Sequence, residues 1–347
     1  MPGWAYGLVL LLALVPRLFQ ATHTPFQFDE IQTLVLLRHS LTAVLASLHQ
    51  TVDPPVHYVV LWLWRAVGGD GALWLKALPI VFGLFTVLAL LPMGRALFSA
   101  RAGILGGALL AVNGTHIASS QNIRAYALSW LLLTLIVWLA WRWTLRSRLT
   151  ESALMFAFAL TALYTDYYSV FVLFALALWG VLRMRNERRR LLLWIGLWML
   201  VALAFAPHLP AMFGQLGRDV GGERWTLALS VSDLVIVTKS LAFGSVWLIP
   251  VLAVVAALPL QRPAQWKAAS LLWFLVLLPT LVPWEMSAQG IHLFIARQML
   301  YTLPLWCLLV GAGLAHMRRL RLAFFLGLAL VLFAAVTWLA QWRVVVA

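Results

Sequence analysis

Apolar runs close to membrane-spanning length, separated by short polar breaks, repeat along almost the whole chain. The hydrocarbon core of a bilayer is about 30 Å thick, and a helix of about 20 apolar residues crosses it. Such runs fold as helices, because lipid offers no partners for backbone hydrogen bonds. The pattern predicts an all-α, polytopic integral membrane protein with about eleven crossings. The expected spans are Trp4–Phe19, Trp74–Gly94, Ala102–Asn113, Ala125–Trp141, Ser152–Tyr164, Tyr167–Leu182, Leu191–Ala206, Val246–Leu260, Ala268–Val282, Gln298–Ala315 and Leu322–Leu339.

Two early stretches do not fit a bilayer core. Between Thr22 and Asp53, apolar residues recur at helical spacing, which predicts two short amphipathic helices lying on the membrane. The run Val56–Ala66 follows Pro54-Pro55, a pair that favours a helix start. At about 1.5 Å per residue this run covers only about 17 Å, so we expect a re-entrant or interfacial helix.

Basic residues predict the orientation. Loops on the cytoplasmic side of membrane proteins carry most of the Lys and Arg. A cytoplasmic N-terminus with a non-crossing Val56–Ala66 places every basic cluster between spans in the cytoplasm, whereas a crossing segment would turn them all outward. The clusters are Arg95/Arg101, Arg142/Arg146/Arg148, Arg183/Arg185/Arg188/Arg189/Arg190, Arg262/Lys267 and Arg318/Arg319/Arg321. In the favoured arrangement every acidic residue except Glu151 and Glu187 faces outward.

Composition excludes several other classes. Hydrophobic residues make up 63% of 347 and charged residues 10%, with a mean hydropathy of +0.93, whereas soluble domains are about 25% charged. The net charge of +14 lies in short clusters without a binding motif, which argues against nucleic acid as a partner. Cys307 is the only cysteine, so an intrachain disulfide is excluded. The first 21 residues lack a basic start and a cleavage site, which favours a retained span over a signal peptide.

Three of the outer loops carry a set of residues suited to chemistry on a lipid phosphate. Arg124 can hold a phosphate bidentately and offset the charge that grows as it leaves. Asp29 or Glu30 can take the proton from an incoming hydroxyl, and a single base without a nucleophilic partner gives inversion. By loop, the candidates are Asp29 and Glu30, Arg124 and Tyr126, and Asp166 and Tyr167.

Each of these residues alone also fits a structural role. Asp29 and Glu30 suit the N-terminus of a short helix, and Asp166 suits the start of the next span. Arg124 suits an interfacial anchor that reaches the lipid head groups. The functional interpretation therefore depends on the combination of residues on one side of the membrane.

The motifs resemble the GT-C superfamily of membrane glycosyltransferases, in the clan of dolichyl-phosphate-mannose protein mannosyltransferases and bacterial aminoarabinose transferases. The resemblance covers roughly the first 200 residues. It rests on Phe28-Asp29-Glu30, Asp53-Pro54-Pro55-Val56-His57-Tyr58, Gly94-Arg95-Ala96-Leu97-Phe98 with Arg101-Ala102-Gly103, Ser120-Gln121-Asn122-Ile123-Arg124-Ala125-Tyr126, Tyr164-Thr165-Asp166-Tyr167-Tyr168, and Arg297 with Pro304.

The resemblance implies an enzyme that moves a sugar from a polyprenyl phosphate to an acceptor hydroxyl. It implies Asp29 as the catalytic carboxylate, with Glu30 as the alternative, and Arg124 as a ligand of the donor phosphate. Further substrate contacts are expected from Asp53, His57, Tyr58, Tyr126, Asp166, Tyr167 and Arg297. The acceptor class stays open between lipid, glycan and protein.

The same resemblance implies a location in the plasma membrane, or bacterial inner membrane, with the site facing the periplasm or cell exterior. Residues 1–206 would form the catalytic transmembrane module, and residues 207–347 a C-terminal transmembrane region with outer loops. No cofactor follows with certainty, and a divalent metal stays open. Two residues depart from the pattern: Asp53 stands where His or Lys commonly precedes Pro-Pro, and Asp166 stands where many bacterial relatives carry His.

Other classes remain as alternatives. A transporter or lipid flippase usually places charges near the bilayer midplane, often in inverted repeats. Here the charges sit at span ends apart from Arg17, and no repeat is present. A non-catalytic lipid-binding or assembly subunit would explain the topology but not the clustered charges. Another lipid-phosphate transferase, such as a polysaccharide ligase, is the alternative among enzymes.

Overall fold

The computed structural model describes residues 3–21, 25–48, 53–216, 219–220, 223–224, 230–291, 293–317, 329–330 and 333. Nearly all of these are helical, and their only strands are the antiparallel pair β1 (Asp219–Val220) and β2 (Glu223–Arg224). The predicted all-α fold class is confirmed.

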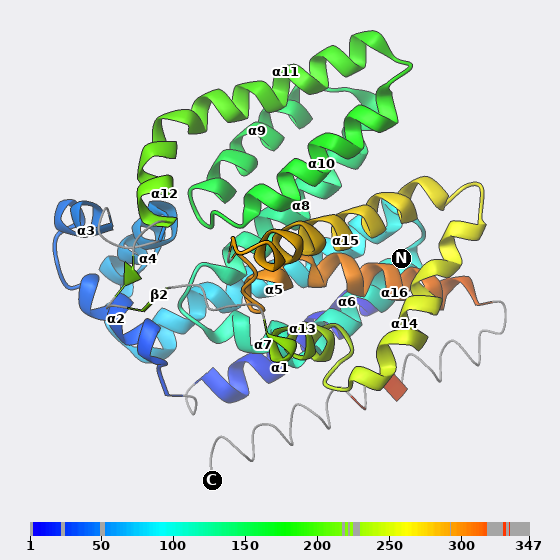
Figure 1. The fold of residues 1–347 in the computed structure, drawn as a ribbon. Helices are drawn as coiled ribbons and strands as arrows, with labels where there is room; N and C mark the ends of the chain where they lie inside the picture. Colours follow the sequence, from blue (N-terminus) through cyan, green and yellow to red (C-terminus); the bar gives the residue numbers. More distant parts are fainter. Residues whose placement is uncertain are drawn as a thin grey trace.

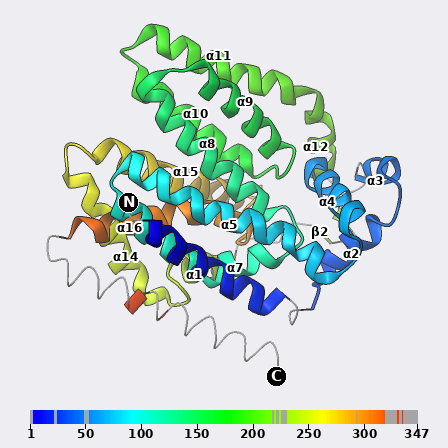
Figure 2. The same ribbon diagram turned by 180° about the vertical axis from the view of Figure 1, so that it is seen from behind.

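The helices form one bundle with a smaller group of helices at one end (Figures 1 and 2). The α-helices are α1 (Gly3–Ala21), α2 (Phe28–Leu36), α3 (Leu41–Leu48), α4 (Pro55–Gly68), α5 (Ala72–Leu97), α6 (Ala100–Val112), α7 (Gly114–Gln121), α8 (Tyr126–Arg146), α9 (Leu149–Leu163), α10 (Ser169–Met184), α11 (Arg188–Phe205), α12 (Leu209–Leu216), α13 (Val231–Leu241), α14 (Ile249–Ala257), α15 (Trp266–Ala288) and α16 (Leu303–His316). The 3-10 segments are η1 (Ala206–His208), η2 (Val246–Leu248), η3 (Leu258–Gln261) and η4 (Gln298–Thr302).

Five described segments are long and apolar enough to cross a membrane: α5, α8, Arg188–Gly214, α15 and Gln298–His316. Two further pairs, α6 with α7 and α13 with α14, pass the same test together but bend by 64° and 65° at their junctions. Three shorter apolar segments lie in α1, α9 and α10. The protein is therefore an integral membrane protein by the length and composition of its helices.

Every predicted span up to Gln298–Ala315 falls on an apolar helix. The count of eleven is not confirmed, because several of these helices are short and two pairs are bent, so length and composition give five to seven crossings. The last predicted span, Leu322–Leu339, lies almost entirely outside the described residues.

The helices of the first outer loop agree with the apolar spacing. Helices α2 and α3 are the two short helices predicted between Thr22 and Asp53. Helix α4 has Pro55 in its first turn, and its 14 residues span about 21 Å, short of a bilayer core. Leu37 from the α2 end, Val44 from α3 and Leu61 from α4 are fully buried in a small core of their own. This core holds the group of helices at one end of the bundle.

The junction between α6 and α7 turns the chain toward that group. Asn113 caps α7 by accepting a hydrogen bond from the His116 N–H, and its amide nitrogen donates to the Ser240 carbonyl, 3.0 Å away. The buried Arg17 of α1 donates to the carbonyls of Ala13 and Ala111 and contacts the His116 ring. These bonds fix the bend, which the sequence did not predict.

Helices from residues 1–206 and from residues 207–347 share one hydrophobic core. Helix α16 packs along α6, and α15 packs along α10. Helices α6 and α16 approach each other closely at glycines: a Cβ on Gly311 would lie 2.4 Å from the backbone nitrogen of Gly106. Small residues at such crossings allow close helix packing in membranes. The division into residues 1–206 and 207–347 stays a prediction.

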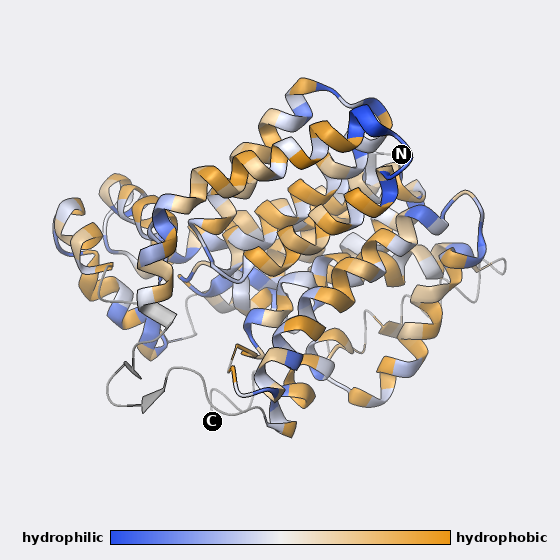
Figure 3. Ribbon diagram, turned by 45° about the horizontal axis from the view of Figure 1, so that its top comes forward, coloured by the Kyte–Doolittle hydropathy of each residue, from blue (hydrophilic) through white to orange (hydrophobic). Residues whose placement is uncertain are grey.

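The long helices carry polar residues at their ends and apolar residues along their middles (Figure 3). Helix α8 starts beside Arg124 and ends at Arg146, and α5 starts next to α4 and ends beyond Arg95. The 26 residues of α5 span about 39 Å. The outer-loop helices and the arginine-rich turns therefore lie at opposite ends of the bundle.

Candidate active site

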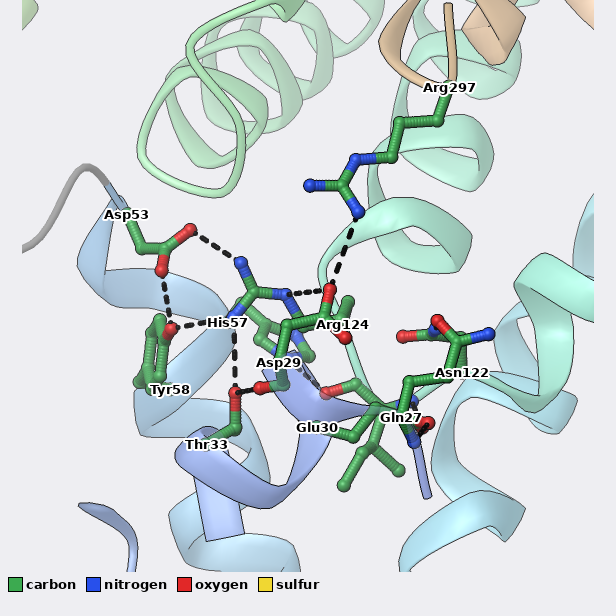
Figure 4. A network of polar contacts seen from close by, with 11 residues as sticks. Gln27, Asp29, Glu30, Thr33, Asp53, His57, Tyr58, Asn122, Arg124 and Arg297 are labelled. Atoms are coloured by element: carbon green, nitrogen blue, oxygen red, sulfur yellow. Dashed lines mark hydrogen bonds and ion pairs between the residues drawn. The ribbon is translucent and has the colours of Figure 1, made fainter. Parts of the chain in front are cut away.

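Arg124 belongs to the short segment between α7 and α8, and its side chain lies at the centre of a polar network (Figure 4). Its Nη2 is 2.9 Å from Asp53 Oδ1, and its Nη1 donates to Thr33 Oγ1 and the Tyr58 hydroxyl, both at 3.1 Å. Its Nε lies 3.9 Å from Asp29 Oδ2. Burial alone would lower the pKa of Arg124, but Asp53, Tyr58, Tyr126 and Asp29 together outweigh this, so the pKa is raised. The guanidinium is a fixed positive charge.

Asp29 joins two guanidinium groups from distant parts of the chain. Its Oδ2 lies 3.9 Å from Arg124 Nε and 3.5 Å from Arg297 Nη1. The Asp29 side chain is 24% exposed and that of Arg297 48%. Figure 4 shows the Arg297 guanidinium reaching toward the Asp29 carboxylate. Two of the predicted substrate contacts, Arg124 and Arg297, therefore meet at the predicted catalytic carboxylate.

The adjacent carboxylate, Glu30, points elsewhere and is bound to the main chain. Its Oε1 accepts the Ile123 N–H at 2.9 Å, and its Oε2 accepts the Gln27 N–H at 2.7 Å. Burial raises the pKa of Glu30, and these two hydrogen bonds partly oppose the rise. Since both oxygens hold backbone groups, the geometry gives Glu30 a structural position and leaves Asp29 facing the arginines.

Two residues of α4 also take separate roles in the network. The Tyr58 hydroxyl donates to Asp53 Oδ2 at 2.7 Å and accepts from Arg124. His57 is buried, and its Nε2 donates to the Ile123 carbonyl at 3.0 Å, because a carbonyl can only accept. Burial lowers the pKa of His57 to about 4, so the ring is neutral at pH 7. His57 therefore holds the backbone beside Arg124.

The segment that carries Arg124 is held on both sides. The Ile123 N–H binds Glu30 and the Ile123 carbonyl binds His57. The Gln121 side chain donates to the Arg17 carbonyl at 2.8 Å. These contacts leave the Arg124 backbone little freedom, which preorganises its side chain.

Sequence reasoning missed two of these participants. Thr33 lies four residues after Asp29, on the same face of α2, and this spacing could have identified it. Ile123 acts through its backbone, so its residue type carried no signal.

The remaining predicted residues lie in the α9–α10 turn and at the start of α8. Asp166 accepts a hydrogen bond from the Tyr168 N–H at 3.0 Å, and the Tyr167 hydroxyl lies 2.9 Å from His208 Nε2. Burial raises the pKa of Asp166 to about 6, while the hydrogen bond from Tyr168 opposes the rise. Arg124 is near enough to interact electrostatically with both Asp166 and Tyr126. Asp166 and Tyr126 therefore border the network around Arg124.

A divalent metal does not fit this donor set well. Among the described residues no group of three or more His, Cys, Asp or Glu side chains converges as metal ligands. The carboxylates of Asp29 and Asp53 both face the Arg124 guanidinium. A metal ion between these two carboxylates would have to displace that positive charge.

Comparison with known proteins finds matches among solved structures. No family model matches the sequence, and no curated protein matches it. ArnT from Cupriavidus metallidurans bound to undecaprenyl phosphate is similar with a TM-score of 0.63 and 14% identity, over 91% of this chain and 60% of that one. The Archaeoglobus fulgidus oligosaccharyltransferase in complex with Zn and sulfate has a TM-score of 0.62 and 13% identity, over 97% of this chain and 52% of that one.

A further structure, archaeal oligosaccharyltransferase AglB from Archaeoglobus fulgidus with an inhibitory peptide and a dolichol-phosphate, has a TM-score of 0.60 at 11% identity, over 97% of this chain and 55% of that one. The chain thus spans little more than half the length of these proteins. At such low identity the likeness establishes a common fold. The GT-C-like architecture expected from the motifs is confirmed at that level.

Proposed function

We propose that the protein is an inverting membrane glycosyltransferase that moves a sugar from a polyprenyl phosphate to an acceptor hydroxyl, with Asp29 as the general base. The observation that carries this proposal is the position of the Asp29 carboxylate between Arg124 and Arg297. The fold shared with ArnT and the oligosaccharyltransferases supports the same class of reaction.

The donor phosphate binds between Arg124 and Arg297. The Nε edge of Arg124 is its least occupied edge, since Asp29 is 3.9 Å away while its other partners are near 3 Å. Arg297 approaches the same carboxylate from the opposite side, and its half-exposed side chain leaves room for a lipid-borne phosphate. Two charge-assisted hydrogen bonds from these arginines would fix the phosphate and its sugar.

Transfer then follows as a single displacement. The acceptor oxygen attacks the anomeric carbon while Asp29 takes the proton of that hydroxyl. The bond from the anomeric carbon to the phosphate oxygen breaks, and its electron pair leaves with the polyprenyl phosphate. The two guanidinium groups stabilise the negative charge that develops there. Attack opposite the leaving group inverts the anomeric configuration.

The proposed location is the plasma membrane, or bacterial inner membrane, with the site on the extracytoplasmic side. This orientation follows from the arginine-rich turns at the other end of the bundle, which the positive-inside rule assigns to the cytoplasm. A transporter is less well supported, because the described charges gather at helix ends. The exception, buried Arg17, is bonded to carbonyls of α1 and α6.

The test compares Asp29→Asn with Asp70→Asn, a matched change at an exposed aspartate that pairs with Arg65. Membranes containing each variant receive radiolabelled undecaprenyl-phosphate sugars, and transfer of label to endogenous acceptors is measured. We expect Asp29→Asn to abolish transfer while retaining binding of undecaprenyl phosphate. Normal turnover in Asp29→Asn would remove Asp29 from the mechanism.

A second candidate is a polysaccharide ligase, because two separate arginines also fit a lipid diphosphate. The lipid product separates the two candidates. A glycosyltransferase with a monophosphate donor releases polyprenyl phosphate, whereas a ligase with a diphosphate donor releases polyprenyl diphosphate.

A further inference from the structure

A pocket lined by two arginines lies at the end of the bundle opposite the candidate active site. Its cavity has a volume of about 380 Å³. It lies where α5 ends and α6 begins, beside the start of α15 and the end of α16. We call it the basic pocket, and its main lining residues are Phe98, Arg101, Arg262, Gln265, Ala312 and His316.

The basic pocket is built on tightly packed helices. Helices α6 and α16 pack so closely that a Cβ on Gly106 would lie 2.9 Å from the Cα of Leu308. Likewise, a Cβ on Gly94 of α5 would lie 2.3 Å from the Cα of Gly103 in α6. The floor of the pocket is therefore part of the bundle core, and Arg101 is carried by the first turn of α6.

Two arginines in this pocket lack an internal counter-charge. Arg101 and Arg262 form no ion pair or side-chain hydrogen bond with any other residue in the described part of the chain. A guanidinium stays charged at all physiological pH values. The N-terminus of α6 and the C-terminus of α16 contribute partial charges of opposite sign, which largely offset each other. The two arginines therefore make the electrostatic potential in the pocket positive.

The described part of the chain offers these two arginines no carboxylate partner. Of the 11 acidic residues in the whole sequence, only Glu151 and Glu187 belong to turns at this end of the bundle. Glu151 pairs with Arg142 at 3.3 Å, and Glu187 pairs with Arg190 at 2.8 Å. No acidic residue occurs between positions 318 and 347. Both arginines are exposed, so an anion from outside the chain can reach them.

We propose that the basic pocket binds a phosphate-bearing anion, with Arg101 and Arg262 as its ligands. Two guanidinium groups match phosphate oxygens in charge and hydrogen-bond geometry. The apolar side chains of Phe98 and Ala312 beside them suit the glycerol and acyl start of a phospholipid. Basic pockets between membrane helices on the cytoplasmic side are known to suit anionic head groups. This site is independent of the proposed transfer reaction.

Two sources carry this chemistry, a phospholipid head group and free phosphate, and the experiment separates them. The protein is purified in phosphatidylcholine nanodiscs, and either phosphatidylglycerol or inorganic phosphate is added. Bound lipid is counted by native mass spectrometry, and protection by either probe is measured as the shift in melting temperature. The test variant is Arg101→Gln/Arg262→Gln. The control, Arg146→Gln/Arg185→Gln, removes the same charge from the same end of the protein outside the pocket.

We expect the test variant to bind phosphatidylglycerol at least about tenfold more weakly than the wild type, and the control to bind it as the wild type does. Protection of the wild type by inorganic phosphate to the same extent would identify a soluble anion as the occupant. Arg101→Lys/Arg262→Lys keeps both charges without the planar donor set, guards against a folding defect and should bind more tightly than the test variant. Equal binding of both probes by the test variant and the control would overturn the proposal.

Discussion

Asp29 Oδ2 lies 3.5 Å from Arg297 Nη1, although α2 and the loop before η4 lie near opposite ends of the described chain. Arg297 thus reaches the same carboxylate oxygen that faces Arg124. This contact gives Arg297 a specific expected role, as the second ligand of the donor phosphate.

Arg297→Gln should therefore weaken donor use more than catalysis by the bound complex. Loss of one charge-assisted hydrogen bond to phosphate costs about 1.5–3 kcal/mol, which raises KM for the donor roughly tenfold or more. Steady-state kinetics with varied donor checks this. Arg65→Gln, which removes an outer arginine paired with Asp70, is the control and should leave KM unchanged.

Arg124 should be more sensitive than Arg297, because it is also part of the folded network. Arg124→Ala is expected to reduce donor use by at least about 2 kcal/mol and to lower the melting temperature, since Asp53 and Tyr58 lose their partner. Arg124→Lys should rescue little, because an ammonium group cannot reproduce the planar set of donors. Unchanged donor kinetics in Arg124→Ala would argue against its assignment.

Replacing the carboxylate by an amide should have different effects at Glu30 and at Asp29. Glu30→Gln removes an acceptor for a backbone N–H and should cost about 1–3 kcal/mol of stability. Transfer by the protein that remains folded should continue. Asp29→Asn should show the reverse pattern, with a normal melting temperature and no transfer. Thermal unfolding and turnover measured on the same preparations distinguish the two outcomes.

His57 should make stability fall in mild acid. Its pKa is about 4 in the folded protein against 6.5 when unperturbed, so the unfolded chain takes up the proton first as pH falls. The stabilising effect of the neutral ring is complete above pH 6.5 and is lost as pH falls toward 4, by up to about 3 kcal/mol. Unfolding of the wild type and of His57→Gln from pH 8 to pH 4 checks this: the stability of the wild type relative to the variant should fall by up to about 3 kcal/mol over that range.

Asp166 should make the folded protein more stable as pH falls, the opposite of the effect of His57. Its pKa is raised from 3.8 to about 6, so the folded state favours the protonated acid. That preference stabilises the fold fully below pH 3.8 and is lost as pH rises through 6, which makes the ionised form costly at pH 7. The change in unfolding free energy caused by Asp166→Asn should therefore be more favourable at pH 7 than at pH 4, by up to about 3 kcal/mol. An equal effect at both pH values would contradict this.

Local patterns predicted much of the fold. The apolar spacing after Thr22 and the helix-starting Pro54-Pro55 identified α2, α3 and α4 because these signals act within a few residues. The bend at Asn113 was missed, because it depends on contacts with Ser240 and with the buried Arg17. Such partners come from distant segments, which periodicity cannot reveal.

The sequence identified most residues of the candidate site, but it could not assign a role to each of them. Asp29 and Glu30 are adjacent and chemically alike, and only the direction of each side chain separates the one facing arginines from the one holding Ile123. Asp53 stood out as a departure from the resemblance, and its contact with Arg124 at 2.9 Å supplies a physical reason for an acid there.

The most direct test of the account is a structure of the protein with bound undecaprenyl phosphate. We expect the phosphate in contact with both Arg124 and Arg297, beside the Asp29 carboxylate, with the lipid tail leaving between helices. A phosphate bound elsewhere, with Asp29 still held between unoccupied arginines, would contradict the proposed function.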